Sequence, residues 1–544
     1  MTGRVDISRL AALPSVVFLR NAFYPERSPY GVAHRFTGLA HELSPEMHAA
    51  LHGDGGLAPD ARAALLDIFA GLGFETVEEG STDPDTWWHA WAHHRLVVPA
   101  HVPAVYTLKT APVRLYRLET LIDCHLPRTA EAPKVVCEPL QAVHAALLRA
   151  AEAETCFGDF LRTTSFTPRE IRDGLLYLSD PNRQMIRLVD PSIFSASLKA
   201  PWHFPFQNYI RATSATDPTA YYEGLEIDGL WNFDWVETTV AHSFRRPTAM
   251  LDGQAYGAAF LRAVARHADL RAVSDILEVG GGTGDLAGAF LRAFLGAAPK
   301  DHPLCYTLQD LSDHLLQRQK QALKSFDHVR YFHGNAEDAL PGRDAFDVIV
   351  CNEVIADLRM MGAAGTVRTA TGCFAFLENV LRALKPGGRA FISEFGDLVS
   401  GNRCVDHLNH TEHSTHFGAL VDCAETLGAR ARVVSLAEFL GMDPQAPLLC
   451  GQHEKYLVIR SVLQDHGVDL DFRAYDRAEF DERFQTILSR IGCGRLDFQP
   501  ACEGLHFGPD LRQFLVLIIE KPPRLAEPAH APRRQPDAMA GSIQ

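Results

Sequence analysis

The sequence predicts an α/β fold built around a mostly parallel sheet, and three observations predict it. Between about residues 246 and 521, short β-rich runs alternate with helical patterns, which is typical of parallel strands covered by helices. A glycine-rich turn at 280–284 joins the first of these runs to a helical pattern. The 544 residues are 47% apolar and 22% charged, so the chain has enough apolar side chains for packed cores. This length exceeds what one core usually holds, so at least two domains are expected.

Three zones divide the chain. Residues 1–245 have an irregular pattern and contain all six tryptophans, and we expect them to form an accessory region for substrate recognition or dimerisation. Residues 246–521 carry the α/β pattern. Residues 522–544 are rich in Pro and Ala and lack apolar periodicity, which predicts a disordered tail.

The first zone contains one helix–helix–strand pattern. Residues 140–161 have helical apolar spacing, and 166–178 begin with a Thr cap, a Pro and a Glu three residues after the cap. With 183–189 as a strand, this order predicts a mixed region that is partly winged-helix-like. The net charge of −15 favours packing or dimerisation over DNA binding. The aromatic stretch at 86–95 fits a substrate wall or a core contact.

The second zone opens on its most informative segment, "SDILEVGGGTGDLA" at 274–287. An apolar strand leads into the glycine loop, and a helix follows. Glycines permit positive φ angles and carry no Cβ, so the backbone can approach a nucleotide-like ligand at the helix start. A ligand site is therefore predicted at the carboxyl edge of the first strand.

Two kinds of ligand compete for this loop. A dinucleotide fingerprint counted from Gly280 fails, because Asp285 stands where its third glycine belongs. Counted from Gly282 it also fails, although Ala287 keeps an Ala variant of this alternative open. The acid Glu278 beside the loop would attract a cofactor that carries an ammonium and a sulfonium, whereas it would repel a pyrophosphate.

The pattern E-x-G-x-G-x-G, from Glu278 to Gly284, resembles motif I of the class I S-adenosylmethionine-dependent methyltransferases. The resemblance implies a Rossmann-like, seven-stranded methyltransferase domain at 246–521 with S-adenosylmethionine as its cofactor. Strands at 305–310 and 329–334 would bring an acid to the ribose hydroxyls and a polar segment to the adenine. The cofactor-binding residues that the resemblance implies are Glu278, Gly280, Gly282, Gly284, Asp310, Asn335, Ala336 and Asn352.

The remaining elements follow the order of that family. A fourth strand begins at Phe346, a helix covers 376–385, and a turn at 386–388 precedes a fifth strand at 389–396. The last strand is expected at 513–521. The stretch from about 437 to 510 is long for a connection, so we expect extra helices there that help to form the acceptor pocket.

Two subfamily resemblances bear on the methyl acceptor. The runs at 310–323 and 351–358 look like MidA-type protein-arginine methyltransferases associated with respiratory complex I assembly, although Asp357 stands one residue late. The "GGGTG" loop after a winged-helix-like region also resembles small-molecule O-methyltransferases, but Asn352 and Glu353 replace their His-Asp pair. The expected reaction is methylation of a nitrogen or oxygen nucleophile on a protein, peptide or small molecule. A catalytically idle, cofactor-binding assembly protein is the alternative from another class.

Carboxylates near the strand ends are the first catalytic candidates. Methyl transfer is an in-line displacement, in which a general base helps when the nucleophile carries a proton. A group of acids would also orient a guanidinium. Glu353 is the first choice, followed by Asp357 and Glu394; the alternative for each is an acid that caps a helix or binds a loop.

Histidines recur at every third position in "DHLNHTEHSTHFGAL", at 407, 410, 413 and 416. We expect them in a loop and in the first turn of a helix that starts near 417, above the sheet edge. His413 or His416 would orient the acceptor or take its proton, and the alternative is a set of ordinary loop histidines. No metal is expected, because the spacing matches neither H-E-x-x-H nor a Cys/His zinc pattern.

Composition limits partners and location. The eleven cysteines include no C-x-x-C pair, which is typical of reduced thiols. No apolar run approaches a membrane span and the start lacks an apolar signal region, so a cytoplasmic protein without a membrane partner is expected. The acidic charge argues against nucleic acid as a partner. A homodimer formed through the first zone fits the pattern.

Overall fold

The computed structural model describes most of the chain. The described residues are 16–20, 30–37, 39–53, 56–72, 91–99, 104–119, 134–180, 183–192, 239–299, 301–359, 370–399, 404–407, 410–449, 453–494, 498–500 and 514–523. The tail predicted to be disordered lies outside these residues from 524 onward. Residues 86–90 of the aromatic stretch also lie outside them.

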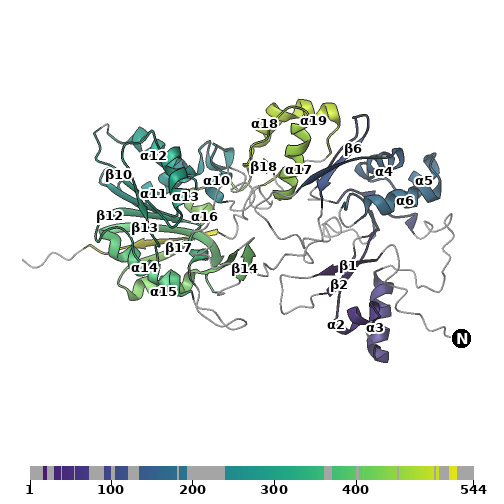
Figure 1. Cartoon of the computed structure of the whole chain (residues 1–544), viewed down its shortest axis with the longest axis horizontal. Helices are drawn as coiled ribbons and strands as arrows, with labels where there is room; N and C mark the ends of the chain where they lie inside the picture. The colour runs from purple at the N-terminus through teal and green to yellow at the C-terminus, as the bar shows by residue number, and fades with distance from the viewer. Residues whose placement is uncertain are drawn as a thin grey trace, which may run out of the picture.

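A central sheet forms the second half of the molecule (Figure 1). Its main path has the order β11–β10–β9–β12–β13–β20–β17, and β16 pairs with β13 as an additional strand. The five strands from β11 to β13 are parallel, while β20 runs antiparallel to both its neighbours. The strands are β9 (Asp275–Val279), β10 (Cys305–Asp310), β11 (Val329–His333), β12 (Phe346–Asn352), β13 (Leu384–Asp397), β16 (Thr415–His416), β17 (Arg430–Ser435) and β20 (Phe514–Glu520).

This order confirms the predicted Rossmann-like class I methyltransferase fold, with the two-residue β16 added to the seven expected strands. Apolar side chains from both faces of the strands form two separate cores. One core includes α11 (Tyr256–Ala265), α12 (Asp285–Ala297) and α16 (Leu436–Leu440), and the other includes α14 (Thr371–Ala383) and α15 (Phe417–Thr426). Helices therefore cover both faces of the sheet (Figure 1).

Two segments of this domain differ from their predictions. β13 begins at Leu384 and includes the predicted turn at 386–388. Gly387 adopts a φ of 83°, and the register between β12 and β13 shifts at this point, so the turn forms an irregularity inside the strand. The histidine stretch is a hairpin instead of a loop: β14 (Cys404–His407) pairs antiparallel with β15 (His410–His413). Four-residue strands are too short to produce a clear period-two signal.

The N-terminal region is built from small sheets and helices. One sheet has the order β1–β2–β3, from β1 (Val16–Arg20), β2 (Tyr30–His34) and β3 (Ala40–Leu43), and it contacts α2 (Pro45–Leu51), which packs on α3 (Pro59–Gly71). A second sheet joins β5 (Ala104–Thr107), β6 (Arg114–Leu118) and β7 (Val135–Pro139). β4 (Arg95–Val97) pairs with β8 (Arg187–Val189).

The helices of this region match the sequence patterns in part. The pattern at 140–161 forms two helices, α4 (Ala142–Glu152) and α5 (Phe157–Thr163). α6 (Pro168–Leu178) starts with the predicted capping box, in which the Thr167 side chain accepts from the Glu170 backbone N–H. β8 follows as the expected strand, but it pairs with a strand from before the helices, so the winged-helix comparison stays a prediction.

Extra helices fill the long connection before the last strand, as predicted. They are α17 (His453–Gln464), α18 (Arg477–Phe480), a π-helical turn η5 (Asp481–Gln485) and α19 (Thr486–Ile491). α17 packs on β5 and β6, and side chains of the connection share a core with Val105, Tyr116 and Leu118. The connection therefore joins the α/β domain to the N-terminal region (Figure 1). Among the described residues, no helix is long and apolar enough to span a membrane.

Candidate functional site

The glycine loop turns sharply between β9 and α12. Gly280, Gly282 and Gly284 have φ angles of 70°, 52° and 87°, which side-chain-bearing residues rarely adopt. A Cβ on Gly280 would lie 2.2 Å from Cγ2 of Val354, and the backbone N–H of Gly280 donates to the carbonyl of Gln309 at 2.8 Å. The loop therefore requires glycine both for its backbone conformation and for its packing against the neighbouring strand ends.

Asp310 ends β10 beside this loop, as predicted, and is almost fully buried. Its Oδ1 accepts the backbone N–H of Ser312 at 3.0 Å, and its Oδ2 accepts Nε2 of Gln319 at 2.8 Å. The same Nε2 donates to the carbonyl of Gly282 at 3.0 Å, so Gln319, from α13 (Asp313–Ala322), joins the loop to the carboxylate. Burial raises the pKa of Asp310 to about 6 despite these bonds.

Glu278 lies inside β9 and is buried. Its Oε2 accepts the hydroxyl of Tyr306 on β10 at 2.5 Å. Burial raises the pKa of Glu278 to about 7, and the nearby charge of Asp310 adds to the rise. Burial therefore favours the neutral form of this carboxyl. The full negative charge inferred beside the loop from sequence is reduced by burial.

The segment predicted to contact adenine follows β11. Two side-chain amides hold it: Gln309 Nε2 donates to the carbonyls of Gly334 and Ala339, and Asn379 Nδ2 donates to that of Ala336 at 3.0 Å. Asn335 Oδ1 accepts the backbone N–H of Glu337 at 2.9 Å. Asn335 and Ala336 thus occupy fixed positions next to the end of β10.

Asn352 and Glu353 follow one another at the end of β12. Asn352 Oδ1 accepts the hydroxyls of Tyr256 and Ser393, each at 2.7 Å, and its Nδ2 donates to Glu353 Oε1 at 2.7 Å. The Asn352 side chain is buried and connects three elements. Its side-chain amide therefore positions the strand end and Glu353.

Glu353 adopts a φ of 58°, a left-handed conformation that is uncommon for a residue with a side chain. Its two carboxylate oxygens accept the backbone N–H of Val240 at 2.9 and 3.1 Å. Val240 is the first residue of the short helix α10 (Val240–Ser243). The leading catalytic candidate thus holds the start of a helix, which is the structural alternative considered for it.

A second bond ties α10 to the glycine loop, and sequence reasoning missed it. Nδ1 of the buried His242 lies 2.9 Å from Oδ2 of Asp285, the first residue of α12, and Thr283 Oγ1 donates to the same oxygen at 2.7 Å. Burial opposes ionisation of Asp285, but the bonds from His242 and Thr283 outweigh it and lower its pKa. In the sequence, Asp285 stands out only because it does not fit the dinucleotide pattern, and no motif surrounds His242.

The other catalytic candidates gather beside a 3₁₀ turn, η4 (Ile355–Asp357). Glu394 accepts the backbone N–H groups of Ala356 at 3.2 Å and Phe395 at 2.9 Å. β15, which ends at the buried His413, packs against η4, so the structure brings His413 and Asp357 to one region.

The remaining histidines have other positions. His416 caps α15, since its Nδ1 accepts the backbone N–H of Ala419 at 3.2 Å. His407 and His410 face each other across the turn of the hairpin in the strand register, and their side chains lie outside the described part of the chain.

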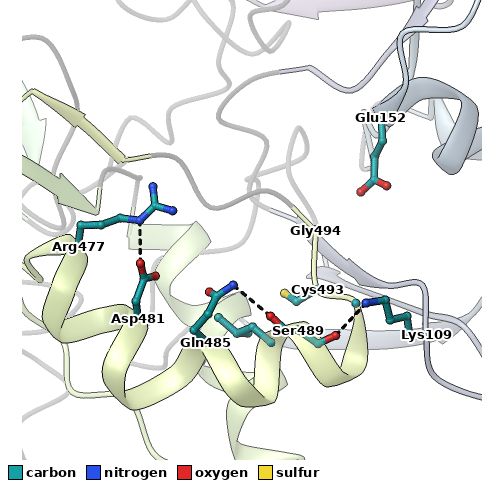
Figure 2. A pocket seen from close by; sticks show the side chains of 10 residues that line it. Lys109, Glu152, Arg477, Asp481, Gln485, Ser489, Cys493 and Gly494 are labelled. Atoms are coloured by element: carbon teal, nitrogen blue, oxygen red, sulfur yellow. Dashed lines mark hydrogen bonds and ion pairs between the residues drawn. The ribbon is translucent and has the colours of Figure 1, made fainter.

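A separate cavity of about 420 Å³ lies between the N-terminal region and the connection helices (Figure 2). Its charged side chains are bonded locally: Arg477 Nε donates to Asp481 at 3.0 Å, and Lys109 Nζ donates to the carbonyl of Ser489 at 3.1 Å. Glu152 reaches towards it from α4. None of the predicted site residues lines this cavity, so it is separate from the carboxyl edge of the central sheet.

A family model described as "Methyltransferase domain" matches residues 277–390, which contain the glycine loop, Asp310, Asn335 and Asn352. Among curated proteins, the ubiquinone/menaquinone biosynthesis C-methyltransferase UbiE of Idiomarina loihiensis is 33% identical over 128 residues, which cover 23% of this chain and 44% of that protein. UbiE of Vibrio vulnificus is 28% identical over 184 residues, covering 33% and 62%. The chain thus spans less than two thirds of these relatives.

Solved structures give weaker likenesses. A TehB-like SAM-dependent methyltransferase from Corynebacterium glutamicum is 22% identical with a TM-score of 0.23, covering 34% of this chain and 79% of the other. A phosphoethanolamine N-methyltransferase from Haemonchus contortus is 14% identical with a TM-score of 0.30, covering 49% and 52%. The assignment of the fold therefore comes from the strand order and the family model.

Proposed function

We propose that this chain, whose residues 277–390 belong to a class I S-adenosylmethionine-dependent methyltransferase domain, transfers a methyl group to a nitrogen or oxygen nucleophile of a small molecule. The observation that carries the proposal is the joint placement of the glycine loop and Asp310, which Gln319 bonds to each other. A methyl-donor nucleoside needs both a close backbone approach and a carboxylate for its ribose.

The residues at this edge fit S-adenosylmethionine. Asp310 accepts the backbone N–H groups of Ser312 and Leu311 and the amide of Gln319, and a carboxylate offers about four acceptor positions, so it can still receive a ribose hydroxyl. The N–H groups of the first turn of α12 and the three positive-φ glycines would face the amino-acid part of the cofactor. Asn335 and Ala336 would lie along the adenine. When bound, the cofactor supplies a methyl group on a positively charged sulfur.

The chain's own contribution is to position the acceptor and to exclude water. α10 is held over the edge at both ends, by Glu353 and by the His242–Asp285 pair. An in-line displacement gains most from such fixed geometry. Asp357 and His413 are the proposed groups that orient the acceptor or take its proton. We assign Glu353 a positioning role, because its carboxylate binds the start of α10.

The nature of the acceptor rests on two observations. Glu353 and Glu394 both accept backbone N–H groups, so these carboxylates already hold local structure and are less suited to clamp a guanidinium. This favours a small molecule over the arginine acceptor suggested by the MidA-type resemblance. A carbon acceptor is the second candidate, because the curated relatives named above are C-methyltransferases.

Calorimetry with S-adenosylmethionine and with its demethylated product tests the first step. Wild-type protein should bind both, and Gly282→Val should abolish binding, since a β-branched residue is strongly disfavoured at a φ of 52°. Gly296→Ala is the matched control, because its added Cβ meets open space in α12. Equal affinity in wild type and Gly282→Val would remove the loop from the proposal.

A mass-resolved screen of small molecules, peptides and proteins tests the second step. Release of demethylated product together with a labelled acceptor distinguishes an enzyme from an idle cofactor-binding assembly protein. A labelled arginine would replace the small-molecule acceptor with a protein. Binding without turnover against every class would favour the assembly role.

A further inference from the structure

Three potential metal ligands converge in the N-terminal region, away from the glycine loop. One ring nitrogen from each of His93 and His94 and one carboxylate oxygen of Asp190 lie within 4.8 Å of one another. No other group of three such side chains occurs in the part of the chain that the structure describes. Two histidines and one carboxylate form a ligand set that zinc and related ions use in proteins.

Backbone pairing imposes this convergence. His94 directly precedes β4 and Asp190 directly follows β8, and Arg95 pairs with Val189 at the ends of these strands. The turn that carries the histidines is fixed from the other side, since the backbone N–H of Phe157 donates to the carbonyl of His94 at 2.7 Å. The ligands therefore stand on elements that are already paired, and a bound ion would not have to order a free loop.

The hydrogen bonds around these side chains leave ligand atoms available for a metal ion. Asp190 Oδ1 accepts the backbone N–H and the hydroxyl of Ser192 at 2.8 and 2.7 Å, which orients its Oδ2 towards His93 Nε2 at 3.5 Å. His94 is 8% exposed, and its Nδ1 makes no hydrogen bond among the described residues.

We propose that His93, His94 and Asp190 bind a divalent transition-metal ion, with zinc favoured by the ligand types. Tetrahedral ligands about 2.1 Å from zinc lie about 3.4 Å apart, and the 3.5 Å between His93 and Asp190 already matches this spacing. The His93 side chain is 60% exposed, so it can rotate to close the third contact while water completes the shell. An exposed His–Asp ion pair alone would stabilise the region little. The site is independent of the proposed methyl transfer.

Full-length protein tests the site. After equilibration with Zn²⁺ and dialysis, metal analysis should find one tightly bound equivalent, and Co²⁺ should give visible d–d bands without a thiolate charge-transfer band. Asp190→Asn and His93→Gln should each weaken Zn²⁺ affinity at least tenfold. Both side chains are partly exposed, so these variants test the site even if the buried His94→Gln misfolds.

Two controls separate this site from adventitious binding. His328→Gln removes an exposed histidine of the central domain and should leave affinity unchanged. His407→Gln with His410→Gln removes two imidazoles of the histidine-rich hairpin and should also leave it unchanged. Loss of the bound equivalent in the hairpin variant, or full affinity in Asp190→Asn and His93→Gln, would overturn the proposal. So would absence of binding at micromolar Zn²⁺.

Discussion

The carboxylate of Glu353 accepts the backbone N–H of Val240 on both oxygens, at 2.9 and 3.1 Å, and so fixes α10 to the end of β12. The two residues are 113 positions apart in the chain. Because the bond is charge-assisted and partly buried, it contributes more than an exposed contact would. Together with the His242–Asp285 pair, this side chain therefore sets the position of α10 beside the proposed acceptor site.

Replacement of Glu353 should separate positioning from cofactor binding. Glu353→Ala removes the acceptor for Val240 and should lower kcat/KM for methyl transfer by about 10- to 100-fold, equivalent to about 1.5–3 kcal/mol. Glu353→Gln keeps one carbonyl acceptor and should recover part of that loss. Calorimetry should find S-adenosylmethionine affinity within a few-fold of wild type in both. A Gln variant as impaired as the Ala variant would instead indicate that the charge itself acts in catalysis.

Gln319 offers a test of the bond between the glycine loop and Asp310. Gln319→Leu removes the amide that donates to both Gly282 and Asp310, so cofactor affinity should fall by about tenfold, the effect of one or two hydrogen bonds. Asp310→Asn should weaken binding at least as much, because it replaces an acceptor oxygen for the ribose with a donor. Gln321→Leu, at an exposed position on the same helix, is the control. Unchanged calorimetric affinity in Gln319→Leu would contradict this role.

Local patterns were sufficient to predict most of the central domain. The apolar run before the glycine loop, the strand ending at Asp310 and the strand beginning at Phe346 all lie where the sequence predicted them. Each of these elements depends on interactions local in sequence. Buried parallel strands consist of continuous apolar residues, and a tight turn between a strand and a helix needs glycine. The cofactor edge follows from their order.

The tertiary contacts that determine what each site residue does could not be predicted from local sequence patterns. Whether Glu353 acts as a base or an anchor depends on a partner from α10, and the bond between His242 and Asp285 also joins distant segments. The ends of β4 and β8 that bring His93, His94 and Asp190 together are likewise far apart in sequence. Such tertiary pairings leave no periodic signal in a single sequence.

Asp285 should stabilise the position of α10 through its charge. Its pKa is lowered in the folded protein, so it contributes stability above its ordinary pKa of 3.8 and loses that contribution as the pH falls through the lower folded value. Asp285→Asn should therefore reduce the free energy of unfolding by about 1–2 kcal/mol at pH 7. Hydrogen exchange at 240–243 should be faster in the variant. Wild-type exchange rates there would show that His242 does not depend on this acid.

Glu278 should make the protein less stable as the pH rises. Burial raises its pKa from 4.5 to about 7, so the folded chain binds this proton more tightly than the unfolded chain does. Stability from this group is complete below about pH 4.5 and is lost as the pH rises to about 7. A rise of this size corresponds to at most about 3 kcal/mol at pH 8.

Glu278→Gln removes the ionisation and keeps an oxygen for the hydroxyl of Tyr306. Urea unfolding at pH 5 and pH 8 should show that the variant gains stability relative to wild type between these two pH values, by up to about 3 kcal/mol. The comparison between the two pH values cancels any constant cost of burying the amide. Glu378→Gln, at an exposed position on α14, should show no such gain. If the difference between Glu278→Gln and wild type is the same at both pH values, then Glu278 is ionised throughout this range in the folded protein, and the charge beside the glycine loop is complete at neutral pH.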